Sequence, residues 1–253
     1  MTGFNELVIQ MNLFRDALVL TAVLLSTQSA RADDAEALAE RMLSVLGGRA
    51  GWASLRNTVN DSQQNRIEEP TELRAVISME FDQPRFRIEM TAPDLHLIRV
   101  VDGENHWRLN RAGQIEDVPA DTLAEDLRWY QGHVYRTLHR IAKRDPELTL
   151  RTAPENRLEV LEAGRRIAWY ALDARGMPYA YGAHDDDTGS LFGPWDFEVE
   201  GIRHPVWVSN RDGSWRVRLM ELSVNVDIDD SLFERPAAVE SIGTAISQPP
   251  GKR

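Results

Sequence analysis

The first patterned segment of the chain is helical. Residues 33–46 carry Leu38, Met42 and Val45 at helical spacing, with acidic residues at the start. Gly47 and Gly48 follow directly, and glycine is common where a helix ends. The pattern predicts a short amphipathic helix over residues 33–46.

After this helix the apolar period changes from 3.6 residues to two. Leu73 to Phe81 alternate with polar residues, and the alternation resumes at Phe86 after a turn marked by Pro84. Strict alternation is typical of half-buried strands. Shorter runs of the same kind predict further strands at 95–101, 105–110, 147–152, 158–162, 166–173, 177–183, 192–199, 205–209 and 214–226.

The last two of these strands carry two local signals. Residues 210–213 read Asn-Arg-Asp-Gly, a sequence typical of hairpin turns. Within residues 214–226 the apolar positions change parity between Trp215 and Leu222. One extra residue in a strand shifts its alternation, so we expect a β-bulge near Met220.

One longer helix interrupts the strands. Residues 120–143 carry an apolar stripe, with acidic residues early and basic residues late, as the helix dipole favours. Gly132 lies in the middle of this segment, where it can bend the helix. Because no strand–helix–strand rhythm repeats, the predicted sheet is antiparallel with helices on one face. The fold class is therefore α+β, with one domain over residues 33–236 and a loose tail over residues 237–253.

The N-terminal segment has the pattern of a secretory signal peptide. Residues 17–25 form an apolar run of nine, too short to span a bilayer as a helix. Ala30-Arg31-Ala32 then gives an A-x-A cleavage pattern. We therefore expect residues 1–32 to be removed on export to the periplasm, with Met1 or Met11 as the true start. A buried N-terminal helix is the alternative.

Composition and charge exclude several classes of protein. The chain has 253 residues and no cysteine, so it has no disulfide, no thiolate metal site, no cysteine nucleophile and no lipid anchor on cysteine. With 40 acidic and 29 basic residues, its net charge is −11. Nucleic acids and anionic membranes require a concentrated basic face. We therefore expect no nucleic-acid partner and no stable membrane insertion.

The sequence offers little evidence for catalysis. It lacks G-x-S-x-G, H-E-x-x-H and Walker motifs, and no two of its six histidines lie four residues apart on a helix. The run His184-Asp185-Asp186-Asp187 resembles part of a calcium loop, but Ser190 stands where glycine is needed. We interpret the run as a solvated hairpin loop. No catalytic residue, metal or cofactor is predicted, and a hydrolase acting through acids near His184 is the enzymatic alternative.

Aromatic side chains give a stronger indication. Tryptophan and phenylalanine recur on the predicted strands, and two interpretations stay open. In one, these side chains fill an ordinary core. In the other, they line the incompletely covered concave face of a curved sheet, which would offer a pocket to an acyl chain. Both need the same alternation, so the period does not separate them.

Several motifs occur in an order that is typical of one family. The helix ending in Gly47-Gly48 is followed by QPRFRIEMTAP at 83–93, VVDGENHW at 100–107, EGIRHPVW at 200–207 and NVDIDDSLFERP at 225–236. This arrangement resembles the LolA-like periplasmic proteins, the outer-membrane lipoprotein-sorting superfamily. Gln83 stands where the lipoprotein carriers have a functional arginine, and the chain is longer than those carriers, mainly through residues 175–210.

The resemblance implies both a fold and a function. The fold would be an incomplete antiparallel β-barrel, a strongly curved sheet of about 10–11 strands whose concave face is covered by helices. The function would be non-catalytic binding or transport of a lipid, of lipoprotein acyl chains or of another hydrophobic ligand. An envelope-stress sensor that binds a protein partner through the same fold is the alternative. The residues expected to line the cavity are Ile77, Met79, Phe81, Phe86, Ile88, Met90, Trp107, Leu109, Trp169 and Phe197.

Overall fold

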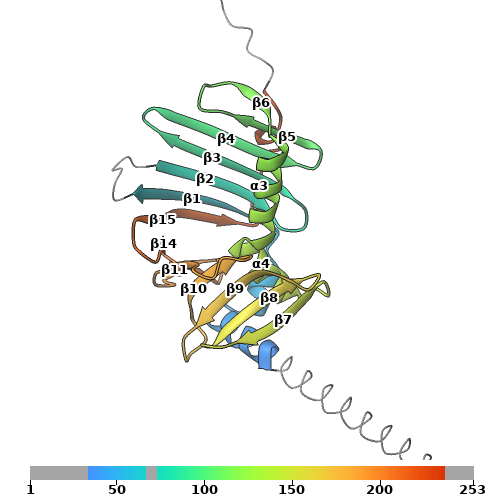
Figure 1. Cartoon of the computed structure of the whole chain (residues 1–253), viewed down its shortest axis with the longest axis vertical. Coiled ribbons are helices and arrows are strands. Elements are labelled where there is room, and N and C mark those ends of the chain that lie inside the picture. The colour runs from blue at the N-terminus through green and yellow to red at the C-terminus, as the bar shows by residue number, and fades with distance from the viewer. Residues whose placement is uncertain (1–33, 67–72, 237–253) are drawn as a thin grey trace, which may run out of the picture.

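One antiparallel sheet of 13 strands runs along the molecule (Figure 1), in the order β6-β5-β4-β3-β2-β1-β15-β14-β11-β10-β9-β8-β7. The computed structural model describes residues 34–66 and 73–236. The strands of this sheet are β1 (Asn57–Arg66), β2 (Leu73–Glu80), β3 (Arg85–Ala92), β4 (Leu95–Asp102), β5 (Asn105–Leu109), β6 (Ile115–Asp117), β7 (Leu148–Ala153), β8 (Arg157–Glu162), β9 (Arg165–Leu172), β10 (Pro178–Ala183), β11 (Ser190–Phe192), β14 (Trp207–Asn210) and β15 (Trp215–Val224). A separate two-stranded sheet pairs β12 (Phe197–Val199) with β13 (Ile202–His204).

Four α-helices accompany the sheet in the described part of the chain. The first covers residues 34–45 and is followed by a turn at Gly47, whose φ of +108° places it in the left-handed region. The others are α2 (Arg49–Ala53), α3 (Ala120–Gly132) and α4 (Val134–Lys143). A 3-10 turn, η1 (Asp230–Leu232), lies near the C-terminal end of the described residues.

The prediction of an antiparallel α+β fold is confirmed, but the prediction of a strongly curved, incomplete barrel is wrong. The sheet is neither closed nor strongly curled, and it has 13 strands instead of about 10–11. Its outer strands β6 and β7 lie at opposite ends of the molecule (Figure 1). α3 and α4, with 13 and 10 residues, make the connection between these two edges. Helices of that total length span up to about 35 Å, so they carry the chain a long way along the sheet from β6 toward β7.

Local sequence signals proved accurate in the second half of the sheet. Residues 210–213 form the turn between β14 and β15, where the Gly213 amide donates to the Asn210 carbonyl. In the ladder between β1 and β15, Asp61 lies opposite Glu221 and the next residue lies opposite Leu219. Met220 is therefore the extra residue of a bulge, which confirms that prediction.

Other elements differ from the predicted ones. The helix predicted over residues 120–143 is broken at His133, whose backbone is extended with φ −63° and ψ 137°. The strand predicted over residues 192–199 is two short strands, β11 and β12, separated by the irregular residues 193–196. The pattern gave no indication of β1, β6 or β13. β1 is largely polar, yet it pairs with β2 on one side and β15 on the other.

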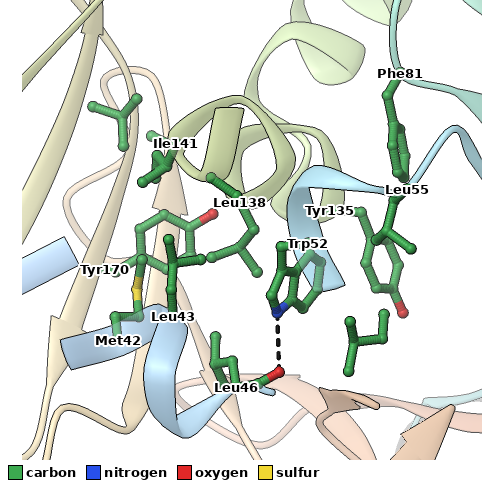
Figure 2. Packing of buried hydrophobic residues seen from close by; sticks show 14 of the residues in the cluster. Met42, Leu43, Leu46, Trp52, Leu55, Phe81, Tyr135, Leu138, Ile141 and Tyr170 are labelled. Atoms are coloured by element: carbon green, nitrogen blue, oxygen red, sulfur yellow. Dashed lines mark hydrogen bonds between the residues drawn. The ribbon is translucent and has the colours of Figure 1, made fainter. Parts of the chain in front are cut away.

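The main core lies between the helices and one face of the sheet. Trp52 of α2 is fully buried, and its indole Nε1 donates to the Leu46 carbonyl at 3.0 Å. Figure 2 shows Trp52 among side chains of the first helix, α4 and the sheet, including Leu138 and Tyr135. Because three helices meet around this indole, its burial ties them together on the sheet.

A smaller core lies on the opposite face of the sheet. Trp107 of β5 packs there with Ile98, Val100, Ile228 and Phe233. The indole Nε1 of Trp107 donates to the Phe233 carbonyl at 2.9 Å. The segment after β15 therefore covers this face, as a buried Trp N–H needs an acceptor.

Two predictions lie outside the described residues: the signal peptide over residues 1–32 and the loose tail over residues 237–253. Within residues 34–66 and 73–236, none of the helices is both long and apolar enough to span a membrane.

Candidate functional site

A cavity of about 300 Å³ lies between the α3–α4 junction and the helix-facing side of the sheet. It is lined mostly by aromatic and aliphatic side chains, and none of the described residues that line it is charged. Those residues are Asn60, Ser62, Ile77, Trp129, His133, Val134, Tyr135, Tyr181, Ala183, Ser190, Phe192, His204, Pro205, Trp207, Val208, Trp215, Val217 and Leu219. Apolar walls with a few polar groups are the usual composition of a small-molecule site.

Two larger hollows have a different character. One, of about 470 Å³, is lined partly by Arg175, Glu198 and Arg203. The other, of about 550 Å³, is lined partly by Arg140 and Asp145. Charged walls of this kind are typical of solvated surface grooves. The aromatic cavity is therefore the stronger candidate for a ligand site.

The break between α3 and α4 brings His133, Val134 and Tyr135 to the cavity. α3 ends at Gly132, His133 is extended, and α4 begins at Val134. The Tyr181 hydroxyl donates to the Gly132 carbonyl, and the Tyr170 hydroxyl donates to the Val134 carbonyl at 3.2 Å. Two tyrosines of the sheet thus bond backbone carbonyls at the break, which fixes the helix junction over the sheet.

Glycine is required at position 132 because the helix approaches the sheet closely. A Cβ atom there would lie 2.7 Å from the Ile167 carbonyl oxygen and 3.1 Å from the Ala183 Cβ. Gly132→Ala is expected to lower the free energy of unfolding by about 2 kcal/mol, since backbone must move to accept the methyl group. Urea denaturation followed by circular dichroism measures this. Ala124→Ser, at an exposed position of α3, is the control and should change stability by less than about 0.5 kcal/mol; equal effects of the two substitutions would contradict the close approach.

One wall of the cavity is a row of rings. The Trp129 and His133 ring centroids are 4.8 Å apart, those of His133 and Tyr135 are 5.4 Å apart, and those of Tyr135 and His204 are 5.1 Å apart. Tyr135 also stacks on Trp52 at 6.2 Å. Through Trp52, this wall continues into the main core, so the cavity borders that core.

The two histidines of this wall are uncharged at neutral pH. Burial lowers the pKa of His133 to about 3. Burial also lowers the pKa of His204 to about 3, although a hydrogen bond with the Pro205 backbone acts in the opposite direction. A buried imidazole loses the solvation of its charged form, which explains both shifts. Each ring therefore offers the cavity hydrogen-bonding groups and no charge.

Several polar atoms at the cavity are buried without a partner. Among the described residues, none hydrogen-bonds to Asn60 Oδ1, His133 Nδ1 or His204 Nδ1. The Asn60 amide Nδ2 donates to the Tyr135 hydroxyl at 3.4 Å, and this is the bond that links the two side chains. Buried polar groups in native proteins are nearly always paired, so such a cluster requires an explanation.

The residues that the sequence predicted to line a cavity fall in several places. Ile77 lines the aromatic cavity. Met79, Phe81, Phe86 and Ile88 are buried in the main core, where the Phe86 ring stacks on Tyr130 of α3 at 5.5 Å. α3 therefore covers the region of the sheet face where these four side chains were expected to contact a ligand.

The remaining five predicted residues are dispersed. Met90 and Leu109 border a separate hollow of about 260 Å³. Phe197 is partly buried, with its ring 6.5 Å from His204. Trp107 lies on the opposite face under Phe233, and Trp169 lies in a third cluster with the Arg157 guanidinium 4.1 Å from its ring. Ligand contact by any of the ten residues stays a prediction.

Sequence reasoning missed most of the cavity. The alternation of Trp215, Val217 and Leu219 had placed these three on one face, which is the cavity face. For Asn60 and Ser62 the sequence gave no strand signal. For His133, only the neighbouring Gly132 indicated an irregularity in the helix.

The acidic run at residues 185–187 occupies the turn after β10. All three side chains are exposed. Asp185 pairs with Arg128 at 2.8 Å, and Asp187 pairs with Arg166 at 2.8 Å. Asp186 accepts hydrogen bonds from the Thr188 and Gly189 amides, as in a side-chain-stabilised turn. Within residues 34–66 and 73–236, no group of three or more His, Asp or Glu side chains is placed to hold a metal ion.

Comparison with known proteins gives structural likenesses and no match of sequence. No family model matches the sequence, and no curated protein matches it. The crystal structure of a DUF1329 family protein from Desulfovibrio piger is similar to this one, with a TM-score of 0.42 and 10% sequence identity. The match covers 81% of this chain and 97% of that chain. A likeness at this level assigns neither a family nor an activity to the chain.

Proposed function

We propose that this protein binds a small hydrophobic ligand in the aromatic cavity and carries it unchanged, as a periplasmic binding or carrier protein. The observation that carries the proposal is the cavity itself, a space of about 300 Å³ walled by rings and aliphatic side chains without a charge. Removing apolar ligand surface from water into such a space is favourable. The sequence resemblance to the LolA-like proteins supports the carrier role, and the predicted signal peptide supports the periplasmic location.

The volume of the cavity limits the size of the ligand. A water molecule occupies about 30 Å³ in the liquid, and a methylene group is of similar size, so the space holds about ten non-hydrogen atoms. That is one short hydrocarbon chain or one substituted ring. Several long acyl chains would require the walls to move apart.

The proposal can be tested by filling the cavity. Val217 lines the cavity, whereas its neighbour Arg218 on β15 points to the other face of the sheet and is exposed. Val217→Trp is expected to weaken the binding of octan-1-ol at least tenfold, because the larger side chain occupies the ligand's space. Isothermal titration calorimetry on the full chain measures the affinity.

Arg218→Trp is the matched control, since it adds the same side chain to the same strand outside the cavity. It is expected to leave the affinity for octan-1-ol within about twofold of the unsubstituted chain. Absence of any binding, or equal binding by all three proteins, would count against a ligand site in this cavity.

A further inference from the structure

The polar atoms of the cavity are concentrated around one side chain. Tyr135 accepts a hydrogen bond from Asn60, and its ring lies next to the rings of His133 and His204. We call these four residues, Asn60, His133, Tyr135 and His204, the polar cluster. His204 is 6% exposed and Tyr135 is 3% exposed, whereas Asn60 and His133 are partly buried, so the cluster extends from the interior to the cavity wall.

The cluster has unused hydrogen-bonding capacity of both kinds. In the described part of the structure, Asn60 Oδ1 and the Nδ1 atoms of both histidines have no partner. The Tyr135 hydroxyl accepts from Asn60 and keeps its own hydrogen to donate. A carbonyl oxygen and a hydroxyl hydrogen are therefore both available, and each neutral imidazole adds its unpaired Nδ1 atom, which donates or accepts according to the tautomer.

The cluster has no means of neutralising a charge. The titratable groups that face it from the surrounding elements are the two imidazoles themselves, Tyr135 and Tyr181, and none of the described lining residues is Asp, Glu, Lys or Arg. Burial keeps the imidazoles neutral, and a positive charge on His133 would oppose one on His204. An ionic ligand group placed here would lose its hydration without gaining a counter-charge.

We propose that the ligand is an uncharged amphiphile, whose hydrocarbon part occupies the aromatic end of the cavity and whose hydroxyl or amide group hydrogen-bonds to the polar cluster. This inference rests on the proposed function and adds the chemical class of the ligand. A hydroxyl group both donates and accepts, which matches the two kinds of unused capacity around Tyr135.

A matched series of eight-carbon compounds separates the two parts of the inference. Octan-1-ol, octane, octanoate and octylammonium share one chain and differ at one end, and each is close to the size that the cavity holds. At pH 7, octan-1-ol is expected to bind about tenfold more tightly than octane, because the alkane leaves the polar cluster unpaired. It is also expected to bind at least tenfold more tightly than either ion, because a buried ion lacks a counter-charge. Competition calorimetry against octan-1-ol measures all four affinities.

Variants at the polar cluster show whether it causes the preference. His204→Phe keeps a ring and removes the hydrogen-bonding atoms, so the preference for octan-1-ol over octane should fall to about threefold or less, with octane binding retained. His204→Gln keeps a hydrogen-bonding group and should retain more of the preference. His133→Phe gives a second, independent variant if His204→Phe does not fold, which thermal unfolding will show.

The outcomes distinguish this inference from the proposed function. If none of the four compounds binds, the proposed function itself fails. If octane and octan-1-ol bind equally, or if octanoate or octylammonium binds most tightly, the cavity is a ligand site. The inference that its ligand has an uncharged hydrogen-bonding group would then be wrong. If His204→Phe and His133→Phe both leave the preference for octan-1-ol unchanged, the two histidines of the polar cluster do not cause it, and the inference is overturned.

Discussion

Trp52→Ala is expected to lower the free energy of unfolding by about 4 kcal/mol, within the range measured for large aromatic side chains removed from cores. Trp52 is fully buried between α2, α4 and the end of the first helix. Its indole N–H bonds the Leu46 carbonyl, and its own carbonyl accepts from His139 at 3.0 Å. The substitution leaves a void and removes the indole hydrogen bond. The Leu46 carbonyl still accepts from the Arg203 amide at 2.9 Å, and the Trp52 backbone carbonyl still bonds His139. The void therefore accounts for most of the expected cost.

The same substitution should also affect the cavity, because Tyr135 stacks on Trp52 from the cavity wall. Urea denaturation measures the loss of stability, and calorimetry with octan-1-ol under native conditions measures any loss of affinity. Trp52→Phe is the matched variant: it keeps most of the packing and loses the hydrogen bond, so it should cost about 2 kcal/mol. A loss below about 1 kcal/mol for Trp52→Ala would mean that the helices do not depend on this contact.

Acidification from pH 7 to pH 5 is the second change with a large expected effect. His133 and His204 have pKa values near 3 in the folded protein, because of burial, against an ordinary value of 6.5. In the unfolded chain these two histidines therefore become protonated below about pH 6.5. In the folded chain they stay neutral until about pH 3. The stability that these two histidines contribute is greatest above pH 6.5 and is lost as the pH falls through this window. At pH 5 each histidine should cost about 2 kcal/mol, or about 4 kcal/mol together.

Variants at these two histidines separate their contribution to the pH dependence of stability from that of other groups. His133→Phe and His204→Phe should each reduce the difference in unfolding free energy between pH 7 and pH 5 by about 2 kcal/mol. Carboxylates titrate around pH 4, so they contribute little at pH 5. Ala124→Ser, at an exposed position of α3 without a titratable group, should leave the difference unchanged. Equal pH dependence in all four proteins would show that the two cavity histidines are protonated in the folded state.

The sequence predicted the strands in which one face is buried, because burial of one face makes apolar and polar residues alternate. β2 to β5 alternate between core and surface, and the hairpin at residues 210–213 and the bulge at Met220 follow from turn chemistry and parity. Alternation does not tell which face the helices cover. Trp107 and Phe86 were therefore assigned to one cavity, although they lie on opposite faces of the sheet. The face on which Trp107 is buried is decided by the segment after β15, which covers it through Ile228 and Phe233.

The polar part of the candidate site lies where sequence signals are weakest. β1 has the residues Asn-Thr-Val-Asn-Asp-Ser-Gln-Gln from position 57 and none of the usual strand pattern. It is a strand because β2 and β15 supply hydrogen bonds on both sides, and pairing of this kind overrides intrinsic preference. That strand contributes Asn60 to the cavity, and the helix break contributes His133. Both depend on contacts with residues distant in the sequence, which local pattern does not contain.

The central claim is that the cavity at the α3–α4 junction receives a hydrocarbon chain with a hydroxyl end. A crystal of the full chain grown with 8-bromooctan-1-ol tests it most directly, because the anomalous signal of bromine locates the chain and the density locates the hydroxyl. The account predicts bromine within the cavity, near Trp207, Trp215 and Val217, with the hydroxyl toward Tyr135. Bromine found only at the molecular surface, at a concentration that saturates binding in solution, would contradict it.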